Sequence, residues 1–523
     1  MCFLVLVNIL NYIDRGIIPG SPTSFDVFIM DTLNTEKPDV YLGLLQSSFI
    51  IGFIISSLVV GYAVHFYPPF FLCGVGCLIW LLAVICSGLS YYVNSYYFLL
   101  CARVFSGVAE ASFQNCIPPW ITRYSPKDST GLWIGYFYAC IPLGTALGYT
   151  FSGLVASKLG WQYSFFIVAA VISPYVPLFF YVSSEFPIPD NWDTTETLSM
   201  LDESEGGVRK SINETKQVPS LKAEVYTVIS NWIWVLISIG SAAQCGSLIG
   251  LGTYGSSFGI ALGYFDDEAS SSTIFGLVLS LSGLFGSYVG GVLVDIITVK
   301  ELNKFKIFKE DSENDEFFNK QLTIGPRKLT VKEAIVLKAL VMITMWASLI
   351  GTILLCGVSF CATKSLFFLV AFLGCTIDFI TTAPMNYSTI LSVVSSSSSL
   401  AIGLNSGVQH LFGDVPSPII VGFIKDELSP QCTGSIEQLT SDACRNEAQG
   451  IKNTMLITNV WGFWTFISSA LLYVLINRKL QSIYYANIDD NTYYNTVASD
   501  NDDTDSSITT NQTPLIKHSD YLE

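Results

Sequence analysis

Charged side chains are scarce in this sequence, and histidine is almost absent. Only 13% of the 523 residues are Asp, Glu, Lys or Arg, and only three are His. Soluble domains carry about 25% charged residues, so this composition excludes an ordinary soluble protein. Hydrophobic residues make up 51% of the chain, and the mean hydropathy is +0.50. We therefore expect an all-α polytopic membrane protein.

The signatures of enzymes and nucleotide sites are also missing. The chain has no phosphate loop and no HExxH motif, which argues against ATP hydrolysis and metalloprotease chemistry. The segment 250–255 matches GxGxxG, but it lies inside an apolar span with no strand before it, so it does not predict a nucleotide site. The sequence predicts neither an enzyme nor a cofactor, and the energy source is expected to be external.

Thirteen cysteines are present without a metal-binding pattern. No CxxC pair and no Cys/His cluster at metal-ligand spacing occurs, so we expect no metal and interpret most cysteines as small hydrophobic residues in helices. Cys432 and Cys444 share one polar loop. The sequence is compatible with a disulfide between them and also with two free thiols. The net charge of −16 argues against a nucleic-acid partner, because such partners select basic surfaces.

Apolar windows long enough to cross about 30 Å of hydrocarbon predict twelve transmembrane helices in two six-helix bundles. The expected domains are an N-terminal bundle at 1–184, a cytosolic linker at 185–222, a C-terminal bundle at 223–477 with a charged insertion at 298–332, and a disordered acidic tail at 478–523. The predicted helices are 2–20, 42–65, 69–91, 96–117, 130–157, 161–184, 226–262, 271–297, 333–359, 364–393, 397–424 and 452–477.

Basic loop residues and a weak internal repeat predict the orientation and the gates. Lys and Arg are retained on the cytosolic side, and here they gather in alternate loops, which places both termini in the cytosol. Gly61-x-x-x-His65 ends the second predicted helix, and Gly291-x-x-x-Asp295 ends the eighth. Internal repeats around a midplane site are typical of secondary transporters. His65 and Asp295 are therefore candidate gating residues, and Asp295 is expected to be the stronger of the two.

The apolar segment 96–124 carries ionisable residues that a membrane helix should not carry. Arg103, Gly107, Glu110 and Gln114 follow a spacing of four, three and four residues, which places them on one face of a helix. A charge at membrane depth costs at least about 2.5 to 3.5 kcal/mol and normally marks a pathway. The alternative is that Arg103 and Glu110 neutralise each other as a structural pair.

The first predicted helix has a similar polar stripe. Asn8, Asn11, Asp14 and Arg15 lie within two turns and share one face. Burial and a nearby cation act in opposite directions on the proton affinity of a carboxylate, so Asp14 and Glu110 are candidate proton-coupling residues. The alternative for Asp14 and Arg15 is a solvated pair at the mouth of the helix.

Polar residues are fewer in the second half. Asp378 is the lone acid of the predicted helix 364–393, and His410 and Asp414 stand four residues apart in helix 397–424. Because His titrates near neutrality, this pair is a candidate pH sensor. A helix kink around Pro416 and Pro418 explains the pair equally well.

Several ordered segments resemble the major facilitator superfamily and, within it, the Spinster family of lipid transporters. The similar segments are the first-helix signature 11–15, the second-helix start 43–49, the fourth-helix run 103–113, the fifth-helix run 136–149 and the eleventh-helix signature 410–418, the most specific match. The resemblance spans nearly all twelve helices. It excludes the two charged insertions and the tail.

The resemblance implies proton-linked movement of a lysophospholipid or sphingolipid by alternating access. Its coupling and substrate group would be Asp14, Arg103 and Glu110. We add Arg15 and Gln114 from the same stripes and Gln46 from the second predicted helix. We expect ionised Glu110 to pair with Arg103, and protonation of Glu110 to release that arginine to a lipid phosphate. The alternatives are a symporter or antiporter of a small organic anion held by Arg103, and a non-transporting sensor or scaffold.

The chain departs from the resemblance in two places. The loop after the second helix usually reads Gly-x-x-x-Asp-Arg, but here the acid is replaced by His65, so the usual charge latch is expected to be missing in this half. The chain also begins inside the first helix, so we expect its start to be incomplete. In the tail, 485–488 and 494–497 fit a Tyr-x-x-apolar sorting pattern. They favour the late endosomal or lysosomal membrane, with the plasma membrane as the alternative.

Overall fold

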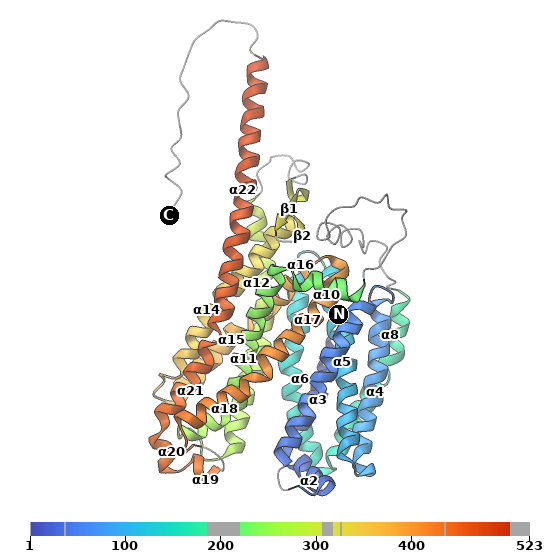
Figure 1. Ribbon diagram of the computed structural model, residues 1–523, viewed down its shortest axis with the longest axis vertical. Coiled ribbons are helices and arrows are strands. Elements are labelled where there is room, and N and C mark those ends of the chain that lie inside the picture. The colour runs from blue at the N-terminus through green and yellow to red at the C-terminus, as the bar shows by residue number, and fades with distance from the viewer. Residues whose placement is uncertain are drawn as a thin grey trace. The chain divides into compact units, whose positions relative to one another are not determined.

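The computed structural model of the chain describes residues 2–35, 38–185, 220–305, 317–324, 327–432 and 436–502 (Figure 1). Two compact units are present, Met1–Ile476 and Asn477–Glu523. The first unit contains every candidate site residue.

The first half of the chain forms six membrane helices and one short addition. Long apolar stretches make these helices, because all backbone hydrogen bonds must be satisfied inside the segment in a lipid environment. A Pro at the first turn begins α2, α3 and α4, where its missing N–H group costs nothing. The elements are α1 (Cys2–Gly20), α2 (Pro22–Leu33), α3 (Pro38–Ala63), α4 (Pro69–Val93), α5 (Tyr96–Tyr124), α6 (Thr130–Lys158), α7 (Trp161–Ile172) and α8 (Tyr175–Ser183).

The second half also forms six membrane helices, several of them interrupted. The helical elements are α10 (Leu221–Ile229), α11 (Trp232–Ala261), α12 (Glu268–Lys304), α14 (Val331–Val358), α15 (Lys364–Phe379), α16 (Thr382–Ser392), the turn η1 (Ser395–Ser397), α17 (Ser398–Gln409), the π-helical η2 (His410–Asp414), α18 (Pro416–Leu428), α19 (Ile436–Leu439), α20 (Asp442–Asn446), α21 (Ala448–Val460) and α22 (Phe463–Asp502). Within the described residues, the predicted all-α membrane fold is confirmed.

Ten spans in the described part are long and apolar enough to cross a membrane by length and composition alone. The other two membrane helices are α5, which carries Arg103 and Glu110, and the interrupted run from α17 through η2 to α18. Polar and ionisable residues lower the hydropathy of α5. The π-helical turn η2 divides the other helix into α17 and α18. These two helices hold five of the candidate site residues, namely Arg103, Glu110, Gln114, His410 and Asp414.

The structure corrects several predicted boundaries. The predicted seventh helix is divided into α10 and α11, because Asn231 caps α11 through a hydrogen bond from Ile233 N to its side chain (3.1 Å). The predicted tenth helix is divided into α15 and α16. The tail was predicted to be disordered from residue 478, but α22 continues to Asp502. Adding residues to an existing helix requires no new nucleus, which explains this extension.

The predicted charged insertion contains an ordered hairpin. Strands β1 (Gln321–Ile324) and β2 (Arg327–Thr330) pair antiparallel, with Leu322 opposite Leu329. Both leucines are buried. Thr330 then caps α14 in a reciprocal arrangement with Glu333. The hairpin is therefore packed into the protein and continuous with the start of α14.

Glycines allow the site helices to approach closely. A Cβ atom on Gly107 would lie 2.0 Å from the carbonyl oxygen of Phe49, and one on Gly52 would lie 2.1 Å from that of Val104. Both distances are far below van der Waals contact, so α3 and α5 can meet only where these side chains are absent. The two halves meet mainly where α6 packs against α12 and α3 packs against α17.

The polar loop between α18 and α21 contains a disulfide. The sulfur atoms of Cys432 and Cys444 are bonded, and both residues are fully buried. Of the two alternatives left open by the sequence, the disulfide is thus confirmed.

Candidate functional site

An ion pair between α1 and α5 lies at the centre of the N-terminal half. Arg103 Nη1 donates to both carboxylate oxygens of Asp14, at 3.1 and 3.2 Å. The indole N–H group of Trp80 on α4 donates to the same carboxylate at 3.2 Å. Asp14 is 1% exposed and Arg103 is 3% exposed. Three helices are therefore joined through one buried carboxylate.

A second ion pair also joins α1 and α5, but here the arginine belongs to α1 and the carboxylate to α5. Arg15 Nε lies 3.4 Å from Glu110 Oε2, with the Glu110 side chain 1% exposed and that of Arg15 24% exposed. The pairing of Arg103 with Glu110 that we expected from the sequence is therefore wrong. Each residue of the expected pair instead binds a charged residue of α1.

Helix geometry explains this correction. Residues seven positions apart lie on the same face, but they are separated by about 10.5 Å along the axis at 1.5 Å per residue. Arg103 and Glu110 therefore share a face without being neighbours. The consecutive Asp14 and Arg15 of α1 lie against this face, and each finds the opposite charge on α5. The alternative of a solvated pair at the helix mouth is excluded, since Asp14 is buried.

The two arginines differ in their surroundings. The Arg15 guanidinium lies 4.5 Å from the ring centre of Phe49 and 5.4 Å from that of Tyr12. Arg103 lies 5.4 Å from Phe49. A guanidinium over an aromatic face is attracted by the ring quadrupole. The Phe49 ring is thus shared by both cations, but only Arg15 retains partial exposure.

The polar stripe continues along α5 to Gln114. Its Nε2 atom donates to Tyr12 Oη at 3.0 Å and to Asn8 Oδ1 at 3.3 Å, and Asn8 donates in turn to the carbonyl of Phe137 at 2.7 Å. These contacts extend the α1–α5 interface to α6. Gln46, the other candidate amide, belongs to α3, but its side chain lies outside the described part of the structure.

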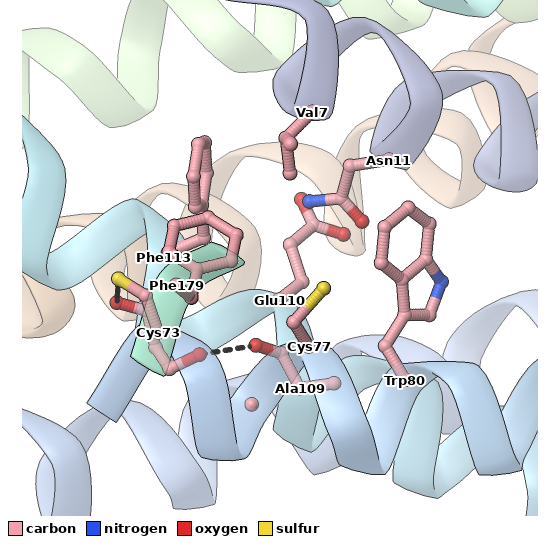
Figure 2. Close-up of a pocket in the computed structure, with 11 residues that line it drawn as sticks. Val7, Asn11, Cys73, Cys77, Trp80, Ala109, Glu110, Phe113 and Phe179 are labelled. Atoms are coloured by element: carbon pink, nitrogen blue, oxygen red, sulfur yellow. Dashed lines mark hydrogen bonds between the residues drawn. The ribbon is translucent and has the colours of Figure 1, made fainter. Parts of the chain in front are cut away.

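A small cavity lies beside Glu110 (Figure 2). Its volume of ≈ 10 Å³ is about the room that one water molecule needs. Glu110 and Asn11 line it together with the thiols of Cys73 and Cys77 and the rings of Trp80, Phe113 and Phe179. The cavity can hold a water next to the carboxylate, but it is far too small for a lipid.

The second half supplies His410 and Asp414 to the interface between the halves. His410 Nδ1 and Asp414 Oδ2 are hydrogen-bonded within the π-helical turn η2. The His410 ring stands edge-on to Phe53 of α3 at 5.5 Å. Asp414 lies within electrostatic range of Arg15, and His410 within that of Glu110. The structure therefore brings these four residues to one region.

Asp378 is separate from this group. It is 4% exposed and ends α15 next to Phe379. Gln244 on α11 donates to its backbone carbonyl at 2.8 Å.

The two gating candidates lie where the halves meet. Asp295 on α12 accepts hydrogen bonds from the backbone N–H groups of Gly131 and Leu132, at 2.7 and 2.8 Å. These groups belong to the first turn of α6, where a carboxylate is favoured by the unpaired N–H groups and the helix dipole. Asp295 of the second half thus caps a helix of the first.

His65 makes a matching connection from the first half to the second. Its Nε2 atom lies 2.9 Å from Glu224 Oε2 and 3.0 Å from Oε1. Glu224 belongs to α10 and is fully buried. We expected no charged contact at this position, but the structure brings the His65 imidazole and the Glu224 carboxylate together.

Sequence reasoning missed Trp80 and Glu224. Trp80 belongs to an apolar helix, where a tryptophan gives no signal of a polar partner. Glu224 follows the N-cap Ser220 by four residues, a position where acids are common for reasons of helix capping alone. Each partner is distant in the sequence, so only the tertiary structure reveals it.

Comparison with known proteins agrees with this architecture. A family model described as "Major Facilitator Superfamily" matches residues 4–418. An Arabidopsis thaliana protein, "Probable sphingolipid transporter spinster homolog 2", is 29% identical over 443 residues, covering 80% of this chain and 79% of that protein. The Danio rerio "Sphingosine-1-phosphate transporter SPNS2" is 23% identical over 453 residues, covering 83% and 77%.

A solved structure is similar as well. The crystal structure of a bacterial homolog of the human lysosomal transporter Spinster, inward-facing and unoccupied, matches with a TM-score of 0.53 at 16% identity, covering 92% of this chain and 97% of that chain. At this identity the likeness concerns the fold. With the family model spanning most of the chain, we conclude that the chain belongs to the Major Facilitator Superfamily and resembles its spinster members.

Proposed function

We propose that this protein is a proton-coupled secondary transporter of an amphipathic lipid, a lysophospholipid or sphingolipid, that works by alternating access. The family and the names of the relatives support a lipid transporter. The observation that carries the mechanism is the asymmetry of the two ion pairs. Asp14 and Arg103 are both buried, whereas Arg15 is 24% exposed and bound to the buried Glu110.

Proton binding to Glu110 removes the charge that holds Arg15. The released guanidinium, still over Phe49, can then bind a lipid phosphate through two parallel hydrogen bonds. One proton is thereby exchanged for one head group at the same arginine. This mechanism keeps the exchange that we expected from the sequence, but it moves the phosphate from Arg103 to Arg15. Arg103 stays with Asp14 and Trp80 and positions α1 against α4 and α5.

The opposite wall of the proposed head-group site comes from the second half. Asp414 lies within electrostatic range of Arg15, and its Oδ1 atom has no hydrogen-bond partner in the described structure. A zwitterionic head group would place its phosphate at Arg15 and its amine at Asp414. A small organic anion would use the arginine alone. Competition between lysolipids with and without an amine therefore tests which substrate class fits.

The two latches define the proposed resting state. Asp295 holds α6, and Glu224 holds the end of α3 through His65. The basic loops place these contacts at the cytosolic end. The conformation described here is accordingly closed toward the cytosol, and both latches must release before the lipid can reach that side.

The test uses purified protein in proteoliposomes with labelled lysolipid and an imposed pH gradient. We expect Glu110→Gln, which mimics the protonated acid, to retain lipid exchange but to lose accumulation driven by the gradient. Arg15→Lys should weaken lipid binding by about 10-fold or more, because a lysine cannot form the bidentate contact. Arg445→Lys is the matched control, since Arg445 is half exposed and lies in the short helix α20 near Asp266.

Full gradient-driven accumulation by Glu110→Gln would contradict the mechanism and leave Glu110 as a structural partner of Arg15. If the wild-type protein exchanges small organic anions but no lipid, the proposed substrate class is contradicted.

The membrane of residence is a separate part of the proposal. The two Tyr-x-x-apolar patterns in the tail support late endosomal or lysosomal residence. Fluorescence of a tagged full-length chain tests this proposal. Steady residence at the plasma membrane would contradict it. If the chain is endosomal, mutation of Tyr485 and Tyr494 should move the fluorescence to the plasma membrane.

A further inference from the structure

Asp378 is a buried acid that the mechanism above does not use. It lies within the membrane span formed by α15 and α16, and it is 4% exposed. On one side α14 approaches it so closely that a Cβ atom on Gly351 would lie 3.0 Å from Asp378 N and 3.2 Å from its Cβ. The glycine makes room for the acid in the packed interior.

The backbone of Asp378 is well satisfied, but its carboxyl group is not. The backbone carbonyl accepts from Gln244 Nε2 at 2.8 Å, from Thr381 Oγ1 at 2.7 Å and from Thr381 N at 3.1 Å. Oδ2 of the side chain is buried without a hydrogen-bond partner in the described structure. A buried, unpaired charge costs several kcal/mol, so such a group normally carries a proton or binds a cation.

No basic residue neutralises Asp378 among the described residues. The titratable groups within electrostatic range are Cys375 on its own helix and Cys245 on α11, and neither is a cation. From the other packed elements, α14 presents Gly351 to it, and α12 presents Gly286 and Gly290 to the adjoining turn. The described groups of His, Cys, Asp and Glu also include no metal-binding cluster.

The position of Asp378 connects it to the gate. The helix breaks directly after it, where Ile380 and Thr381 separate α15 from α16. Beyond the break, α16 packs against α5 and α6 of the first half as well as against helices of its own half, whereas α15 packs against α12 and α14 of its own half. Asp378 therefore lies at the bend of a membrane helix whose second segment contacts both halves.

We propose that Asp378 is a second proton-binding site, in the C-terminal half, whose protonated state stabilises the bend between α15 and α16 in the closed conformation. Ionisation would require a hydrogen-bond donor or water at Oδ2, which the packed interior supplies only if the helix segments move apart. The role of this proton in transport depends on the proposed function. Its existence does not.

Infrared spectroscopy of purified protein with ¹³C-labelled aspartate tests the site directly. We expect the carbonyl stretch of a protonated aspartic acid at neutral pH. The band should disappear in Asp378→Asn. It should also disappear from the labelled set in Asp378→Glu, a second variant that keeps an acid in place. Asp266→Asn is the control, because Asp266 is almost fully exposed in a loop, and it should leave the band unchanged.

Absence of the band in wild-type protein at neutral pH would overturn the proposal, as would its retention in Asp378→Asn. A band that appears only after Na⁺ is removed would also overturn it and assign a sodium ion instead. In proteoliposomes, Asp378→Asn should reduce the number of protons moved per lipid by one. If wild-type protein moves no lipid, the proposed function fails, and the infrared result decides the proton site alone.

Discussion

The two halves of the molecule treat their buried charges differently. In the first half, Asp14 and Glu110 each have an arginine partner from a neighbouring helix. In the second half, Glu301 of α12 and Lys338 of α14 form one buried pair between helices. Among its candidate site residues, however, Asp378 has no ion pair within the described part, and His410 and Asp414 pair within a single turn. Pairs between helices fix the packing of a bundle, whereas a lone acid or a local pair can change its charge without separating helices. The difference indicates a firmly held contact between α1 and α5 in the first half and a more adaptable bend between α15 and α16 in the second.

The largest expected effect comes from breaking the fully buried pair. Asp14→Asn leaves Arg103 charged and buried without its carboxylate, which should cost about 3 to 5 kcal/mol of unfolding free energy. The control is Asp266→Asn in the exposed loop, which should cost almost nothing. Thermal unfolding of the purified protein in one detergent measures both. Equal stability of the two variants would show that the first half is not held by this pair.

Adding a methyl group at a tightly packed glycine of the first half should also lower the unfolding free energy, whereas the same change at an open position of the second half should not. Gly107→Ala places a methyl group 2.0 Å from the Phe49 carbonyl oxygen, so α3 and α5 must move apart, at a cost of about 1 to 3 kcal/mol. Gly276→Ala on α12 is the matched control, since a Cβ atom there has nothing within 4 Å. Unfolding curves for the two variants compare them. If Gly107→Ala is as stable as the control, the interface between α3 and α5 is looser than its contacts indicate.

The latches between the halves are expected to contribute less, and more equally than the sequence predicted. Glu224→Gln weakens the contact with His65, and Asp295→Asn removes one of the two hydrogen bonds to α6. Each loss is worth about 1 to 3 kcal/mol in the closed state, and both should increase cysteine accessibility from the cytosolic side. Lys320→Gln in the insertion serves as the control. If only Asp295→Asn increases cysteine accessibility, the contact at Asp295 is the stronger latch, as the sequence predicted.

The smallest effect is expected at the lone acid of the second half. Asp378→Asn removes a buried group that has no ion-pair partner to abandon, so unfolding free energy should change by less than about 1 kcal/mol. This result contrasts directly with Asp14→Asn, although both replace a buried aspartate by its amide. A loss as large as that of Asp14→Asn would reveal a cation partner for Asp378.

The sequence by itself determined the fold class and most of the site residues. Its apolar windows required helices, because an isolated segment in lipid must satisfy its own backbone hydrogen bonds. The charges at Asp14, Arg103 and Glu110 were identified because they are costly at membrane depth whatever surrounds them. Both inferences depend on local properties of a segment, which a single sequence contains.

Only the tertiary structure decided which charge binds which. Arg103 and Glu110 are on one face of one helix, yet the axial rise separates them, and their partners are the adjacent Asp14 and Arg15 of α1. The same holds for His65 and Glu224, which are 159 residues apart. Helical periodicity specifies the face on which a side chain lies, but the partner depends on how two helices are rotated and shifted against each other. Close contacts such as Gly107 against Phe49 set that rotation and shift, and they form only when the bundle assembles.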